Sequence, residues 1–120
     1  MKTVLLVEDG ITEREFLSGE LRKAGFKVVS ASSVEEAETK LSTQKPDLIV
    51  LDVILPGKSG FEFCRELKGS SETKTIPVMI CSTKDTDVDK MWGSMLGADA
   101  YVPKPVNPQD LVTTLQTIVK

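Results

Sequence analysis

The chain has 120 residues, a net charge of −3 at pH 7 and a hydrophobic fraction of 40%, which suits one globular domain with its own core. The acidic balance argues against a nucleic-acid-binding surface, because such a surface needs a clustered basic face. With no histidine and two cysteines, the chain lacks the usual nitrogen ligand of a zinc site and the base of a Ser-His or Cys-His nucleophile. We expect Cys64 and Cys81 to be reduced residues in or near the core.

The first apolar segment, residues 4–7, follows Lys2 and Thr3. Glu8 and Asp9 end this run after four residues, which is shorter than the core of a signal peptide. No apolar run approaches the length that spans a bilayer. We therefore interpret the segment as a buried strand and expect one cytoplasmic domain over the whole chain, residues 1–120.

Short apolar runs alternate with amphipathic segments of helical length along the rest of the chain. The expected strands are residues 4–7, 28–29, 48–51, 78–81 and 100–102. The expected helices are residues 12–24, 34–43, 59–69, 85–96 and 108–119. This alternation is typical of a parallel α/β sheet, and continuous apolar runs indicate strands that are covered on both faces.

The expected helices carry recognisable signals at their ends. Their starts match capping boxes or an N-cap followed by proline, at Thr12-x-x-Glu15, Ser33-x-x-Glu36 and Asn107-Pro108. Gly25 and Gly97 follow helical segments and predict the points at which those helices stop.

Polar side chains follow four of the five expected strands. Glu8 and Asp9 follow the first, Asp52 the third, Ser82 and Thr83 the fourth, and Lys104 the fifth. Because ligands of open parallel sheets bind beyond the carboxyl ends of the strands, we expect these side chains to gather at one edge. Each residue taken singly is typical of a solvated loop, but together they form a specific chemical set.

That set fits phosphoryl chemistry. Three carboxylates at one edge repel one another, and burial raises the cost. A hard dication removes that cost, since Mg²⁺ takes one or two carboxylates, keeps waters and bridges to phosphate oxygens. A lysine and a hydroxyl would pair with other phosphoryl oxygens, and a carboxylate can act as a covalent nucleophile in phosphoryl transfer. The set therefore predicts an aspartyl phosphate formed with Mg²⁺.

Over essentially its whole length, the chain resembles the response-regulator receiver family, whose best-known stand-alone member is the chemotaxis regulator CheY. The segments that carry the resemblance, in order and spacing, are residues 4–9, 46–52, 55–61, 76–82 and 97–105. Each is weak alone, and the five together are highly specific. The resemblance implies a doubly wound, flavodoxin-like fold, with five parallel strands in the order 2-1-3-4-5 and five helices.

Carried over residue by residue, the resemblance makes Asp52 the phosphoacceptor, with Ser82 and Lys104 as its catalytic partners. It places Mg²⁺ on three carboxylates and one backbone carbonyl, those of Glu8, Asp9, Asp52 and Ile54. It also implies that the peptide bond between Lys104 and Pro105 is cis.

Ser82 and Tyr101 would form the switch, with the aromatic side chain swinging inward when the hydroxyl engages the phosphoryl group. Three positions depart from the family pattern, one of them Lys58, which stands where an apolar or acidic residue is common. Gly10 stands where a serine or similar residue commonly follows the acidic pair, and Thr83 replaces a usual alanine. We still expect Thr12 to cap the first helix and Ser82, at the family position, to be the switch hydroxyl.

The implied donor is a phosphohistidine on a histidine kinase or phosphotransfer protein, because this chain has no histidine. Phosphorylation would change the surface formed by helix 85–96, strand 100–102 and helix 108–119, which would control a partner protein. Chemotaxis, phototaxis and pilus motility are open as the process. We expect no enzymatic activity beyond self-phosphorylation and dephosphorylation, no binding to nucleic acid or membrane, and a monomer or a phosphorylation-dependent dimer.

Other functions compete with this one. A receiver cut from a longer DNA-binding regulator and an unphosphorylated docking receiver both fit the same residues. A phosphatase of the haloacid dehalogenase type needs an aspartate two positions after the nucleophile, where this chain has Ile54. A nucleotide or flavin binder is disfavoured, because no glycine-rich phosphate loop follows the first strand.

Overall fold

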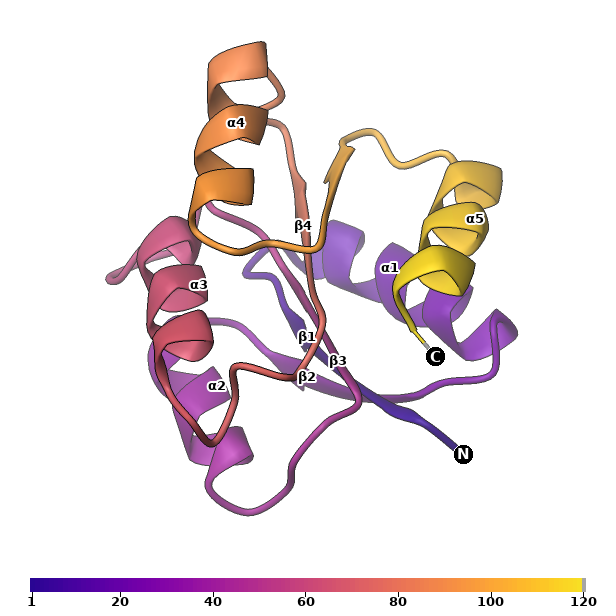
Figure 1. Ribbon diagram of the computed structural model, residues 1–120. Coiled ribbons are helices and arrows are strands. Elements are labelled where there is room, and N and C mark those ends of the chain that lie inside the picture. Colours follow the sequence, from indigo (N-terminus) through magenta and orange to yellow (C-terminus); the bar gives the residue numbers. More distant parts are fainter. Residues whose placement is uncertain (120) are drawn as a thin grey trace.

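The computed structural model describes residues 1–119, which form one parallel sheet in the order β2-β1-β3-β4-β5. The strands are β1 (Thr3–Val7), β2 (Lys27–Ala31), β3 (Leu48–Leu51), β4 (Val78–Ser82) and β5 (Ala100–Pro103). The helices are α1 (Ile11–Lys23), α2 (Val34–Leu41), α3 (Gly60–Gly69), α4 (Asp87–Met95) and α5 (Pro108–Ile118). In Figure 1, α1 and α5 lie on one side of the sheet and α2, α3 and α4 on the other. The doubly wound α/β fold and its strand order are therefore confirmed.

The central strands contribute side chains to two apolar layers, one on each face of the sheet. Val4 of β1 points into the layer under α1 and α5, and Leu5 into the layer under α2 and α3. Every residue of β1, β3 and β4 is buried, as the continuous apolar runs predicted. Cys81 and Cys64 are free and lie in opposite layers. Burial raises the pKa of the Cys64 thiol to about 11 and that of Cys81 to about 12, so both behave as core residues. No helix in residues 1–119 is long and apolar enough to cross a membrane.

The register of the sheet aligns the residues at its carboxyl edge. Val7 pairs with Leu51, so the residues that follow them, Glu8 and Asp52, emerge side by side from β1 and β3. Ser82 at the end of β4 pairs with Pro103 at the end of β5, and Lys104 comes next. The strand pairing therefore brings the acidic residues, the hydroxyl and the lysine to one edge.

Most of the expected helix ends are present. Ser33 and Asn107 cap α2 and α5 with their side chains, and Gly25 and Gly97 adopt φ values of +97° and +100° after α1 and α4. The capping box at Ser33 is incomplete, because the carboxylate of Glu36 accepts from the N–H of Ser32 instead of Ser33.

The expectation that Thr12 caps α1 is wrong. The helix begins at Ile11, its N-cap is Gly10, and no side chain caps it. The N–H of Gly10 donates to the Glu8 carboxylate at 3.1 Å, and the Gly10 carbonyl accepts from the N–H of Arg14 at 2.9 Å. These bonds start the helix immediately after the acidic pair, so Thr12 falls inside the first turn.

Gly60, the first residue of α3, lies where this helix passes close to the end of β3. A Cβ atom at this position would be 2.0 Å from the Asp52 carbonyl oxygen and 2.6 Å from the Cα of Val53. The N–H of Gly60 donates to the Val53 carbonyl at 3.0 Å. The missing side chain thus lets α3 hold the backbone that carries Asp52.

We expect Gly60→Ala to destabilise the protein by about 1–3 kcal/mol, because the overlap is with backbone atoms that cannot yield cheaply. Gly19→Ala in α1 is the matched control. No atom lies within 4 Å of its added Cβ, so alanine there should stabilise the helix by about 0.5–1 kcal/mol. Free energies of unfolding in urea test the pair, and equal stabilities of the two variants would contradict the close approach.

Candidate functional site

The centre of the carboxyl edge is an ion-paired triad of residues that directly follow three strands, β1, β3 and β5. The ammonium of Lys104 lies 2.9 Å from Asp52 Oδ2 and also contacts Glu8 Oε1. All three side chains are largely buried, with exposed fractions of 11% for Lys104, 4% for Glu8 and 7% for Asp52. One ammonium therefore balances two buried carboxylates, which would otherwise repel each other.

The second oxygen of each carboxylate is held by the loop that follows its strand. Asp52 Oδ1 accepts from the N–H of Ile54 at 3.0 Å, and Glu8 Oε2 accepts from the N–H of Gly10 at 3.1 Å. In both cases the donor lies two residues further along the chain. The two carboxylates are thus fixed in the same way, between Lys104 and their own loop.

Burial and pairing act in opposite directions on the charges of this triad. Burial raises the pKa of Glu8, and the hydrogen bond from Lys104 offsets part of that rise. Burial by itself lowers the pKa of Lys104, but its hydrogen bonds to Asp52 and Glu8 outweigh burial and leave the pKa raised. Lys104 is therefore held as an ammonium at neutral pH.

Asp9 lies outside the triad. It is exposed, and its carboxylate has no hydrogen bond or ion pair within residues 1–119. In that part of the chain, no three His, Cys, Asp or Glu side chains form a preassembled metal cage. The expected crowding of three carboxylates is thus relieved by Lys104, and Asp9 stays apart. Because Mg²⁺ needs only one or two carboxylates and retains waters, the oxygen donors of Asp9, Asp52 and the Ile54 carbonyl still fit that ion.

Arg14 is a site residue that sequence reasoning missed. Its Nη1 donates to the backbone carbonyl of Glu8 at 3.0 Å and reaches that of Asp9 at 3.5 Å. It therefore ties the first turn of α1 to the acidic loop. Its position five residues after Asp9, on the first turn of the expected helix, was the available signal.

The two candidate hydroxyls differ in their surroundings. Ser82 is fully buried at the end of β4, its Oγ accepts from the N–H of Lys84 at 3.2 Å, and its carbonyl accepts from the N–H of Lys104 at 3.0 Å. Thr83 is exposed. The structure therefore places Ser82 inside the edge of the sheet and Thr83 on its outer surface.

Tyr101 is connected to Ser82 through Lys84. The Tyr101 hydroxyl donates to the carbonyl of Lys84, the residue whose N–H donates to Ser82. The ring packs over Gly93, where an added Cβ would be 3.0 Å from Tyr101 Cδ2. Burial, followed by nearby aspartates, raises the pKa of Tyr101 to about 12, so its hydroxyl remains a donor. Lys84, in the loop after β4, is thus hydrogen-bonded to both expected switch residues, to Ser82 through its N–H and to Tyr101 through its carbonyl.

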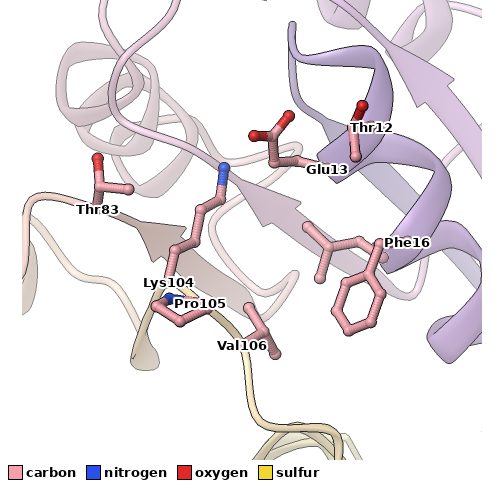
Figure 2. Close-up of a pocket in the computed structure, with 8 residues that line it drawn as sticks. Thr12, Glu13, Phe16, Thr83, Lys104, Pro105 and Val106 are labelled. Atoms are coloured by element: carbon pink, nitrogen blue, oxygen red, sulfur yellow. The ribbon is translucent and has the colours of Figure 1, made fainter.

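A cavity of about 600 Å³ adjoins the triad between α1 and the segment after β5. Figure 2 shows Lys104 extending along it, with Phe16 of α1 facing Val106 across it. The residues that line it are Thr12, Glu13, Phe16, Leu17, Thr83, Lys104, Pro105 and Val106. The peptide bond between Lys104 and Pro105 is cis, as the resemblance implied. The cavity itself was not apparent from the sequence, because it depends on how α1 and this segment pack.

Known proteins resemble the chain over nearly its whole length. Protein PilH of Pseudomonas aeruginosa is 36% identical over 119 residues, which cover 99% of this chain and 98% of PilH. The chain spans about half the length of other curated relatives, which are transcriptional regulatory proteins.

Solved structures share the fold. The chemotaxis response regulator CheY4 of Vibrio cholerae has a TM-score of 0.91 and 34% identity, and the match covers 99% of both chains. The Mn²⁺-bound form of the response regulator Rcp1 has a TM-score of 0.82 and 28% identity, covering 98% of this chain and 91% of the Rcp1 chain. The family model of the response regulator receiver domain matches residues 4–116. The chain therefore belongs to the response regulator receiver domain family.

Proposed function

We propose that this receiver accepts a phosphoryl group on Asp52 from a phosphohistidine donor, in a Mg²⁺-dependent reaction. The observation that carries the proposal is the setting of the Asp52 carboxylate. It is buried at the end of β3, with Lys104 at one oxygen and the N–H of Ile54 at the other. A carboxylate held in this way is oriented for attack on phosphorus. The ammonium beside it can pair with an oxygen of the incoming phosphoryl group and balance its negative charge.

In the transfer, an Asp52 oxygen forms a bond to phosphorus while the bond from phosphorus to the donor's histidine nitrogen breaks. The electron pair of the broken bond stays with the imidazole. Lys104 then pairs with a phosphoryl oxygen. Bound Mg²⁺, held by Asp9, Asp52 and the Ile54 carbonyl with Glu8 in support, would neutralise negative charge on the phosphoryl oxygens. The existence of a Mn²⁺-bound form of the response regulator Rcp1 supports the binding of a divalent ion.

Phosphorylation would be relayed through the loop between β4 and α4. Ser82 accepts from Lys84 in this structure, and its own hydroxyl proton is free to donate to a phosphoryl group on Asp52. That movement would loosen the hold of Ser82 on the loop that Tyr101 also contacts. Tyr101 would then turn inward and change the surface formed by α4, β5 and α5.

The partners follow from the chemistry. The chain has no histidine, so the phosphohistidine would be presented from outside these 120 residues, by a histidine kinase or a phosphotransfer protein. The changed surface would control a partner protein in the cytoplasm, and the chemotaxis role named for CheY4 favours a motility pathway. We further propose that the protein catalyses only its own phosphorylation and dephosphorylation, and that it acts as a monomer or as a phosphorylation-dependent dimer.

Incubation with acetyl phosphate and Mg²⁺ should add one phosphoryl group, measured by intact mass. Asp52→Asn should abolish the addition, and Asp110→Asn, which changes an exposed aspartate of α5, should not. Chelation of Mg²⁺ should also abolish it. Because a charge-assisted contact contributes about 1.5–3 kcal/mol, Asp9→Ala should raise the Mg²⁺ concentration required by about 10–100-fold. Full labelling of Asp52→Asn, or labelling that ignores chelation, would count against the proposal.

Beryllofluoride with Mg²⁺ should change the fluorescence of Trp92, which lies on α4 next to the glycine that Tyr101 contacts. Ser82→Ala should weaken this response by about 2–10-fold, since it removes one hydrogen bond that favours the active form, while Asp52 is still labelled. Thr83→Ala is the matched control and should respond as wild type. If Thr83→Ala weakens the fluorescence response and Ser82→Ala does not, the switch hydroxyl is that of Thr83. An unchanged response in both variants would contradict the relay.

A further inference from the structure

The outer surface of α4 carries an unusual concentration of exposed apolar side chains. Val88, Met91, Trp92 and Met95 have exposed fractions of 68%, 58%, 47% and 69%. They are half of the exposed large apolar residues in residues 1–119. Their spacing of i, i+3, i+4 and i+7 places them on one stripe of the helix. Only Gly93 of α4 is buried, so this helix turns its apolar stripe outward.

One side of the stripe, at Trp92, lies next to α3. Gly93 faces the sheet, against Tyr101 and Ile80. Trp92, on one flank of α4, lines a groove of about 240 Å³ whose other wall is α3. The opposite flank carries polar residues, Lys90 and Ser94, both exposed. The apolar surface therefore runs from the solvent-facing side of α4 into the groove between α3 and α4, which lie side by side in Figure 1.

The groove combines apolar and charged walls. It is lined by Ser59, Phe61, Glu62 and Arg65 near and on α3, and by Trp92 and Leu96 near and on α4. A hollow beside an apolar helical stripe is the kind of surface into which a partner helix places its own apolar residues. Exposed apolar patches with polar rims are also typical of interaction sites.

The dimensions favour a single helix over a second copy of the chain. The nine residues of α4 are about 13 Å long, so the stripe and groove offer much less than the roughly 800 Å² per partner that stable protein interfaces bury. A short amphipathic helix, which needs only three or four anchor residues, matches this surface.

The charges near the stripe indicate the chemistry of that helix. Asp85 and Asp87 are exposed just before and at the start of α4, and their carboxylates have no hydrogen bond or ion pair within the described chain. They lie at the end of the stripe that begins with Val88. A docked helix would therefore carry lysine or arginine at the end that meets these aspartates.

We propose that the groove between α3 and α4, together with the stripe of Val88, Met91, Trp92 and Met95, docks an amphipathic helix of the downstream partner that has a basic end. The regulation of this docking rests on the proposed function, because Tyr101 contacts α4 at Gly93 and is itself part of the relay. The docking surface itself does not depend on the proposed phosphorylation, because it is inferred from the exposed side chains and the groove. Tyr101 can thus act on α4 from the β5 side while the partner is held on the α3 side.

A synthetic 14-residue helix of leucine and lysine, with leucine at positions i, i+3, i+4 and i+7, is the probe. It should bind the full chain and shift the fluorescence of Trp92 to shorter wavelength. Met95→Gln should weaken binding by about tenfold, since it places a polar amide in the apolar contact. Ser94→Gln, the same new side chain on the opposite flank of the helix, should leave binding unchanged. Both positions are exposed, so neither change should affect folding.

Three outcomes would overturn the proposal. Equal binding of a leucine and glutamate helix would refute the basic end. A concentration-dependent dimer in sedimentation that Met95→Gln abolishes would make a second copy the occupant. No binding with or without beryllofluoride would remove the docking site. Labelling of Asp52 in the same samples separates the two proposals: peptide binding without labelling would contradict only phosphorylation, and labelling without peptide binding would contradict only docking.

Discussion

The pairing of Lys104 with Glu8 and Asp52 is the interaction on which the site depends. Two carboxylates buried at a sheet edge would each carry a desolvation penalty of several kcal/mol, and one ammonium balances both. The backbone completes their hydrogen bonds through Gly10 and Ile54. Within residues 1–119, no buried side-chain nitrogen or oxygen lacks a hydrogen-bond partner. The three charged residues directly follow three different strands and are up to 96 positions apart in sequence, so the site exists only when the sheet is paired in its native register.

This arrangement also gives the site its capacity to switch. Lys104 is ion-paired with Asp52 in the unmodified protein. A phosphoryl group on that aspartate would give the same ammonium additional oxygen acceptors. Ser82 is in a similar position, because its hydroxyl is bonded to the loop through Lys84 and has a proton left to donate. The proposed signal is an exchange of partners by groups that are already in place. Its reach to α4 depends on the contact of Tyr101 with Gly93, and a ligand can bias such an equilibrium only by binding one state more tightly.

Simple rules were sufficient to predict from the sequence a parallel α/β sheet and the residues at its carboxyl edge, and the resemblance to the receiver family supplied the strand order. Continuous apolar runs identified β1, β3 and β4, and the rule that ligands bind beyond parallel strands selected Asp52 and Lys104. Features that depend on how loops and helices pack were not predictable in this way. The sequence predicts that α1 starts at Thr12, but hydrogen bonds to Glu8 and Gly10 start it one residue earlier, at Ile11. The role of Lys104 as the internal counter-charge, and the outward orientation of the stripe on α4, required the positions of side chains that sequence periodicity does not supply.

The most direct test of this account is a double-mutant cycle between Lys104 and Asp52, measured as free energies of unfolding in urea with metal chelated. Lys104→Met should destabilise the protein by about 3–5 kcal/mol, because it leaves two buried carboxylates without their counter-charge. Adding Asp52→Asn should restore part of that loss, since it removes one of the unpaired charges, and the coupling free energy should exceed about 1 kcal/mol. Effects that add to within about 0.5 kcal/mol would contradict the claim that Lys104 neutralises Asp52 and that the site is built on this pair.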